Sequence, residues 1–248
     1  MVKIDNIEIT NIGPIRNLKL KFNPHFNIIC GSNGIGKTTI LECLAESFCG
    51  NNYTLRKNSC SELGRWIIGL HNCQSSFQKT IEIDSERPNV DLLTSFWDLV
   101  EFAPYVLYYK TNRALAYTSI DAISKDPELN KYRCSERLMT GSNYVEIKKW
   151  FINRFLWSGH AGELSPEQMS NLEAAKQVFV MMSDGFSFAR IDHETNDIVL
   201  NSPTGKIVFE QLSSGFISFA IILLGLIKDI EYRFKEPHIK VEDFDGIL

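Results

Sequence analysis

The stretch Gly31-Ser-Asn-Gly-Ile-Gly-Lys-Thr38 decides the fold, because it gathers three glycines, a lysine and a threonine into one short loop. The apolar run Phe26-Asn-Ile-Ile-Cys30 precedes it, and residues 39–48 repeat apolar side chains at helical spacing after it. A loop between a strand and a helix can hold phosphates, since its backbone N–H groups converge on them and glycines keep side chains out of the way. We therefore expect residues 31–38 to bind a phosphate chain.

ATP and Mg²⁺ are the expected ligands of this loop. Lys37 is expected to reach the β- and γ-phosphates, the Thr38 hydroxyl to coordinate Mg²⁺, and Thr39 to lie near the α-phosphate. The expected ATP-binding residues of the loop are Gly31, Ser32, Asn33, Gly34, Ile35, Gly36, Lys37, Thr38 and Thr39. A glycine-rich turn formed by chance is the alternative, and the flanking strand and helix patterns favour the binding loop.

Composition describes an ordinary globular chain of 248 residues, with 44% hydrophobic and 23% charged residues and a net charge of −4. This balance gives no overall positive field for nucleic acid, although a local basic groove stays open. The six cysteines have no metal-ligand spacing and are expected to be reduced thiols of a cytoplasmic protein. The longest apolar run, 216–227, is too short to span a bilayer and predicts a buried helix, so no membrane partner is expected.

Periodicity predicts the remaining elements. Alternating or apolar runs predict strands at 4–9, 18–22, 26–30, 79–84, 106–109, 186–191 and 198–200. Helical spacing predicts helices at 39–48, 91–100, 143–157 and 166–182, the last capped by Ser165. The expected division is an N-terminal lobe, 1–113, a helical insertion, 114–183, and a last part, 184–248, with a hairpin, a second motif and a helix.

The run Ile7-Glu-Ile-Thr-Asn-Ile-Gly-Pro-Ile15 ahead of the glycine loop resembles the SMC/RecF branch of ABC-type ATPases, heads of the AAA family in which an antiparallel strand pair leads into the P-loop. A second motif, Leu212-Ser-Ser-Gly215, stands before the apolar helix and is similar to the ABC signature. The resemblance implies an α/β fold, that of a P-loop NTPase (ABC ATPase-like) with an N-terminal antiparallel β subdomain and a helical insertion.

The signature resemblance implies a composite site. In the family, the residues that correspond to Ser213 and Gly215 face the γ-phosphate of ATP held by a partner copy, so two chains form a head-to-tail dimer around two ATP molecules. This sequence departs from the fuller pattern, since Ser214 replaces the first glycine and Phe216 the usual glutamine. A serine that only caps its own helix is the alternative.

The element Tyr108-Tyr-Lys-Thr-Asn-Arg113 resembles the Tyr-Tyr-x-x-Asn-Arg element of bacterial anti-phage defence ATPases, including Septu-type and retron-associated ones. The resemblance implies an effector partner, such as a nuclease, and a phosphate contact for Arg113. A surface salt bridge is the alternative for Arg113. No glutamine stands at the Q-loop position, where Thr111 or Asn112 could substitute. Trp150-Phe151 fits the same group, although core packing is the favoured reading of these two side chains.

ATP cleavage needs an apolar strand that ends in Asp-Glu after the signature, the Asp for Mg²⁺ and the Glu for the attacking water. No such pattern occurs between Gly215 and Leu248. We expect these catalytic residues beyond Leu248, in a longer ATPase that converts ATP to ADP and phosphate. The alternative is a chain that binds ATP without efficient hydrolysis.

Two other functions stay open. A DNA-repair head of the RecF or SMC type would act directly on DNA and bind it in a salt-sensitive manner. An ATP-sensing scaffold would use its nucleotide structurally and show no turnover.

Overall fold

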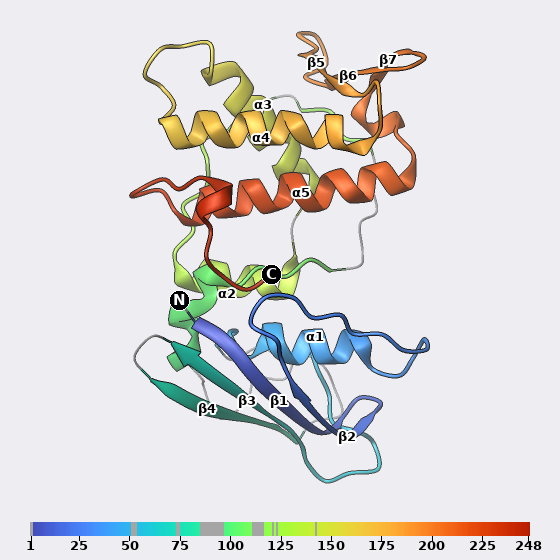
Figure 1. The fold of residues 1–248 in the computed structure, drawn as a ribbon, viewed down its shortest axis with the longest axis vertical. Coiled ribbons are helices and arrows are strands. Elements are labelled where there is room, and N and C mark those ends of the chain that lie inside the picture. The colour runs from blue at the N-terminus through green and yellow to red at the C-terminus, as the bar shows by residue number, and fades with distance from the viewer. Residues whose placement is uncertain are drawn as a thin grey trace. The chain divides into compact units, whose positions relative to one another are not determined.

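A computed structural model describes residues 2–50, 54–72, 75–84, 97–110, 117–120, 122, 124–141 and 143–248. The chain divides into two compact units, shown in Figure 1. The first comprises Met1–Tyr108, Asn130–Thr140 and Asp245–Leu248, and the second comprises Tyr109–Leu129 and Gly141–Phe244. The sequence-based boundaries at 113 and 183 stay a prediction. In the structure, the helices expected in the insertion and the hairpin expected after it belong to the same unit.

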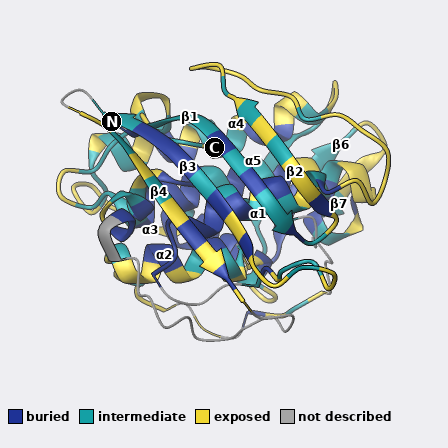
Figure 2. Cartoon of the chain, turned by 90° about the horizontal axis from the view of Figure 1, so that it is seen from below, coloured by how far each residue is buried: buried dark blue, intermediate teal, exposed yellow. Residues whose placement is uncertain are grey.

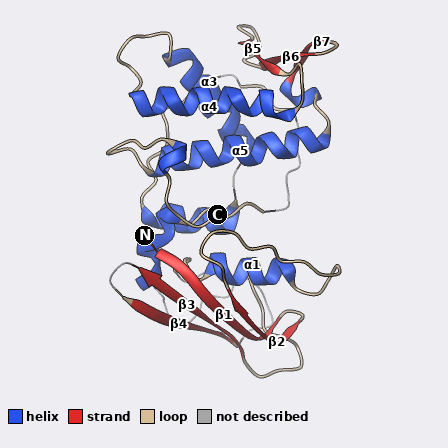
Figure 3. Ribbon diagram, in the orientation of Figure 1, coloured by secondary structure: helices blue, strands red, loops and turns tan. Residues whose placement is uncertain are grey.

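The first unit is built on a four-stranded antiparallel sheet of order β2-β1-β3-β4. Its elements are β1 (Val2–Ile12), β2 (Ile15–Lys21), α1 (Lys37–Glu46), β3 (Gly64–Asn72), β4 (Ser76–Ile83), the 3₁₀ helix η1 (Trp97–Tyr105) and α2 (Lys131–Thr140). Figure 3 shows α1 running along the sheet. The expected antiparallel strand pair ahead of the glycine loop is confirmed, and the strand expected at 79–84 is present as β4.

Alternation of side chains fixes which face of this sheet is buried. Ile7 and Ile9 of β1 are completely buried, and Ile7 pairs with Ile68 of β3 on one side and Leu20 of β2 on the other. Trp66 of β3 is also fully buried, and its indole Nε1 donates to Ser47 Oγ at 2.9 Å, just after α1. In Figure 2, exposed residues alternate with half-buried ones along most of β2, and with half-buried and then buried ones along β4. The sheet therefore buries one face against the segment that carries the glycine loop.

The second unit packs three helices and a small sheet around one core. Its elements are α3 (Tyr144–Trp157), α4 (Pro166–Met182), β5 (Ser187–Ile191), β6 (Ile198–Ser202), β7 (Gly205–Val208), the 3₁₀ helix η2 (Phe209–Gln211), α5 (Ser214–Arg233) and the 3₁₀ helix η3 (Val241–Asp243). The three strands form an antiparallel sheet of order β5-β6-β7. Trp150 and Phe151 lie fully buried in this core, which confirms that they are packing residues.

Helix boundaries in the second unit follow local signals. Ser165 caps α4 by accepting from the backbone N–H of Gln168, and Gln168 Oε1 accepts in return from the backbone N–H of Ser165. Pro166 occupies the first turn, where its missing N–H costs nothing. Among the described residues, no helix is both long enough and apolar enough to cross a membrane.

Two expected strands are not formed as predicted. Residues 26–30 form no strand, and of 106–109 only Val106 makes a bridge, with Ile247. Apolar character alone cannot form a strand, because a strand needs a hydrogen-bonding neighbour. Of the helix expected at 91–100, residues 91–96 lie outside the described residues, and the part from Trp97 is the 3₁₀ helix η1. The α/β class itself is confirmed.

Candidate functional site

The segment that leads into the glycine loop is held by a turn instead of a sheet. The backbone N–H of Asn23 donates to Asn27 Oδ1 at 2.7 Å, and Asn27 Nδ2 donates back to the Asn23 carbonyl at 2.9 Å. This turn leaves Phe26 and Ile28 77% and 73% exposed. Phe26 and Ile28 therefore face away from the core of the unit, whereas Ile29 is partly buried against it.

Glycines are required in the loop for two separable reasons. Gly34 and Gly36 have φ values of +82° and +106°, in the region that side chains with a Cβ rarely adopt. A Cβ at Gly34 would meet no atom within 4 Å, whereas one at Gly36 would lie 2.7 Å from Ile15 Cγ1. Gly34 therefore serves the backbone turn, and Gly36 also permits the close approach of the loop to β2.

The side chain of Lys37 forms hydrogen bonds back to the start of the glycine loop. Its Nζ donates to the carbonyls of Gly31 at 2.7 Å and Ser32 at 2.8 Å, so the chain curls around the ammonium group. This arrangement holds a positive charge at the centre of the loop. A third N–H of the ammonium group stays available for a phosphate oxygen.

The N-terminus of α1 is suited to an anion. The helix begins at Lys37, its cap residue Gly36 supplies no side-chain hydrogen bond, and its first turn contains no acidic residue. Backbone N–H groups at such an end carry a partial positive charge. Residues 31–35 and Thr38 are exposed, and Thr39 is half-buried. The residues present fit ATP with Mg²⁺, because Thr38 offers an exposed hydroxyl beside the phosphate cradle.

The far end of α1 carries a buried acid that sequence reasoning missed. Glu46 is 2% exposed and accepts from the backbone N–H of Thr54 at 3.1 Å and of Leu55 at 3.4 Å. Burial raises the pKa of its carboxyl to about 7, against the lowering effect of the hydrogen bonds from Thr54 and Leu55. Glu46 thus ties the end of the loop-bearing helix to the chain at 54–55.

The second motif lies in the other unit, at the start of α5. Ser213 is the cap residue of this 20-residue helix, and its Oγ accepts from the backbone N–H of Phe216 at 3.4 Å. Ser213, Ser214 and Gly215 are exposed, and a Cβ at Gly215 would meet open space. The capping role is therefore present, and the exposed N-terminus of α5 also remains available to an external anion.

Buried polar contacts hold the segment just before Ser213. Lys148 of α3 is completely buried, and its Nζ lies 2.6 Å from Asp197 Oδ1 and 2.7 Å from Glu210 Oε1. Tyr144 OH donates to the same Glu210 oxygen at 2.5 Å, and the Tyr144 ring stacks on Phe209 with centroids 5.7 Å apart. The 3₁₀ turn Phe209–Gln211 is therefore fixed on α3, and with it the start of α5.

The electrostatics of this cluster favour the charged lysine. Burial acts to lower the pKa of Lys148, but hydrogen bonds and charges from Asp197 and Glu210 outweigh it and raise the pKa above its ordinary value. Burial, the hydrogen bond to Glu210 and the charge of Glu210 all raise the pKa of Tyr144, so this hydroxyl stays a donor. Periodicity contains no signal for this cluster, because Asp197 and Glu210 stand 49 and 62 positions from Lys148.

Of the Tyr-Tyr element, the structure places the two tyrosines. Tyr109 OH donates to Asp229 Oδ2 of α5 at 3.2 Å. Burial, with added effects of Glu42 and Glu46, raises the pKa of Tyr108 to about 12. Arg113, Thr111 and Asn112 lie outside the described residues. The structure thus brings together residues 31–39 in one loop and the first turn of α1, and Ser213 with Gly215 at the start of α5.

Comparisons with known proteins agree with this geometry. Over 254 aligned residues, the chain is 36% identical to the Septu protein PtuA of Bacillus thuringiensis, a match that covers all of this chain and 63% of the relative. It is 23% identical over 150 residues to the DNA double-strand break repair Rad50 ATPase of Archaeoglobus fulgidus, covering 58% of this chain and 14% of that relative. The chain therefore spans less than two thirds of the length of either relative.

These matches confirm the predicted resemblance to SMC- and Septu-type ATPases. A family comparison gives the broader assignment: residues 6–185, which include the phosphate loop, match the family described as AAA domain. Because this match covers most of the sequence, the chain belongs to the AAA domain family.

Proposed function

We propose that this chain is the ATP-binding head of an ABC-type ATPase that dimerises on ATP and regulates an effector, a nuclease, in anti-phage defence. One observation carries the nucleotide part: the glycine loop encloses Lys37 and ends at the uncapped, acid-free N-terminus of α1. The similarity to a Septu protein supports the defence role.

ATP binding uses residues 31–39 in this proposal. The loop amides and Lys37 hold the phosphates, while Thr38 holds Mg²⁺, which would screen the phosphate charges and orient the β- and γ-oxygens. The ABC-like arrangement requires that Ser213 and Gly215 of a second copy approach the γ-phosphate. Their exposure at the start of α5 supports this role, since an exposed helix N-terminus can accept an anion from another molecule.

Binding and cleavage are separate in this proposal. The described residues supply a cradle for ATP, and the sequence after Gly215 contains no apolar strand that ends in Asp-Glu. We therefore assign ATP binding and ATP-driven dimerisation to residues of this chain, and we assign none of its described residues to ATP hydrolysis.

The decisive experiment compares two substitutions in the full-length protein. Lys37→Ala is expected to abolish ATP binding, measured by calorimetry. Ser213→Arg is expected to keep ATP binding while it blocks dimerisation by ATP and Mg²⁺, measured by sedimentation. Thr204→Arg, in the exposed β6–β7 turn of the same unit, is the matched control and should behave as the parent protein. Normal dimerisation of Ser213→Arg would refute the composite site.

The similarity to a Rad50 ATPase favours one other function, direct action on DNA. This function predicts that the protein binds duplex DNA with an affinity that falls steeply as salt rises. A titration of labelled duplex at about 50 and 200 mM salt distinguishes it from the effector model, which predicts no binding by the head alone.

A further inference from the structure

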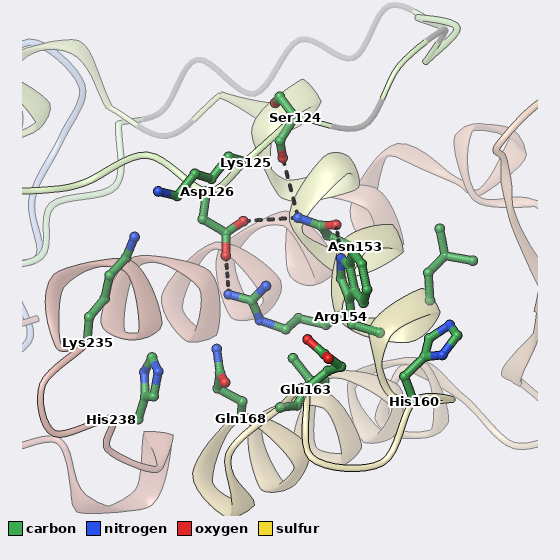
Figure 4. A pocket seen from close by; sticks show the side chains of 13 residues that line it. Ser124, Lys125, Asp126, Asn153, Arg154, His160, Glu163, Gln168, Lys235 and His238 are labelled. Atoms are coloured by element: carbon green, nitrogen blue, oxygen red, sulfur yellow. Dashed lines mark hydrogen bonds and ion pairs between the residues drawn. The ribbon is translucent and has the colours of Figure 1, made fainter.

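A cavity of about 910 Å³ lies within the second unit, and none of the residues assigned to ATP above lines it. Its walls come from the end of α3, the α3–α4 connection, the first turn of α4, the chain after α5 and residues 124–126 (Figure 4). This volume lies within the range of about 300–1,000 Å³ that small-molecule sites occupy.

The floor of the cavity is a cluster of buried polar side chains that form ion pairs and hydrogen bonds with one another. Arg154 is 4% exposed and forms ion pairs with Asp126, at 2.5 Å, and with Glu231. Asn153 Nδ2 donates to Asp126 Oδ1 at 3.2 Å, and Gln168 Nε2 donates to Glu231 Oε1 at 3.4 Å. Because these contacts already fix the side chains, the floor of the cavity is rigid before a ligand binds.

Three basic side chains stand at one side of the cavity. Lys125, Lys235 and His238 occupy the left of the view in Figure 4. In the described part of the chain, neither lysine has a carboxylate within ion-pair distance, and the buried Nδ1 of His238 has no hydrogen-bond partner. Two unpaired ammonium groups beside the His238 side chain would be met by a phosphate group.

An aromatic platform forms another part of the wall. Trp157 is 46% exposed, and its Nε1 donates to Asn153 Oδ1 at 3.0 Å. The ring centroids of Trp157 and His160 lie 5.7 Å apart. The hydrogen bond fixes the orientation of the indole, so its exposed surface can receive a planar ring at low entropic cost. A nucleobase has such a ring, and stacking on tryptophan accepts any base.

Glu163 restricts the ligand further. Its carboxylate lines the cavity, carries no ion pair among the described residues, and in Figure 4 lies between the basic side and His160. A carboxylate repels a run of phosphates but accepts hydrogen bonds from sugar hydroxyls. The wall thus offers cations for one phosphate, an acceptor for hydroxyls and a surface for a base.

We propose that this cavity binds a nucleotide unit with a terminal phosphate, with the phosphate at Lys125, Lys235 and His238, the sugar at Glu163 and the base on Trp157. The same chemistry is offered by a free nucleoside monophosphate and by the 5′-phosphorylated end of an oligonucleotide. The site is independent of the glycine loop and needs no ATP.

The test uses the full-length protein with Lys37→Ala, which is expected to remove nucleotide binding by the glycine loop. This variant is titrated with AMP by calorimetry. Titrations with adenosine and with inorganic phosphate measure the nucleoside and the phosphate separately. A titration with a 5′-phosphorylated trinucleotide tests whether the end of an oligonucleotide binds. AMP is expected to bind at least about tenfold more tightly than adenosine or phosphate. Tighter binding of the trinucleotide than of AMP assigns the site to nucleic-acid ends, and the reverse assigns it to free nucleotides.

Substitutions of residues that line the cavity test whether AMP binds there. Lys125→Glu with Lys235→Glu is expected to weaken AMP at least about tenfold, and Trp157→Ala is expected to weaken it by about fivefold or more. Lys206→Glu, on exposed β7 of the same unit, is the control and should leave the affinity unchanged. Circular dichroism establishes that each variant is folded. An absence of AMP binding at millimolar concentration, or equal binding by all folded variants, overturns the proposal.

Discussion

The ammonium group of Lys148 lies 2.7 Å from Glu210 Oε1 at a position where the lysine is completely shielded from solvent. Glu210 stands three residues before Ser213, so this ion pair joins the core of α3 to the segment that starts α5. Breaking a buried pair leaves an uncompensated charge, which is more costly than the loss of the attraction itself. The contact therefore makes α3 a determinant of where the signature segment lies.

Lys148→Met is expected to lower the free energy of unfolding by about 3–5 kcal/mol, because Asp197 and Glu210 lose their shared cation. ATP binding to the glycine loop should survive in the folded fraction, whereas ATP-driven dimerisation should weaken. Urea unfolding, calorimetry and sedimentation measure the three quantities.

Lys176→Met is the control for this change, because Lys176 pairs with Glu173 on the surface of α4 and such pairs contribute about 0–1 kcal/mol. If Lys148→Met and Lys176→Met had equal effects on stability and dimerisation, the buried contact would not position the signature segment.

Gly36→Ala is expected to abolish ATP binding, because the new methyl group would lie 2.7 Å from Ile15 Cγ1 in a backbone with φ +106°. Gly162→Ala tests backbone strain alone, since Gly162 has φ +85° and open space around its Cβ position. It should cost about 1 kcal/mol of stability and leave ATP affinity unchanged. Calorimetry with ATP compares the two, and retained binding by Gly36→Ala would remove the steric argument.

Local signals and long-range contacts explain which features the sequence could predict. The bounds of α4 agree with the prediction because Ser165, Pro166 and Gln168 encode its start within four residues. The phosphate loop is likewise local. Residues 26–30 failed as a strand because pairing depends on a neighbour elsewhere in the chain. The contact between Lys148 and Glu210 has no periodic signature, since 62 positions separate them.

The free energy of unfolding is expected to fall as pH rises, through the carboxyl of Glu46. Burial places its folded-state pKa at about 7, above the value of 4.5 for an exposed carboxyl. The folded state therefore binds the proton more tightly, so this stabilisation is complete below about pH 4.5 and is lost as pH rises through 7. The shift corresponds to about 3 kcal/mol.

Urea titrations at about pH 5 and pH 7.5 measure this effect. Glu46→Gln removes the titrating group and should flatten the pH dependence, whereas Glu62→Gln, on the surface of the same unit, should preserve it. An unchanged pH profile in Glu46→Gln would assign the dependence to other groups.

The apolar segment ahead of the glycine loop is expected to tolerate truncation, in contrast to the sheet beside it. Ile28→Ala removes atoms from a side chain that is 73% exposed, so the free energy of unfolding should change by about 0.5 kcal/mol or less. Ile9→Ala makes the same chemical change at a fully buried position of β1 and should cost about 2–5 kcal/mol. Urea unfolding measures both. A cost above about 2 kcal/mol for Ile28→Ala would show that residues 26–30 are buried in solution, as they would be if a strand neighbour covered them and ordered the approach to the phosphate loop.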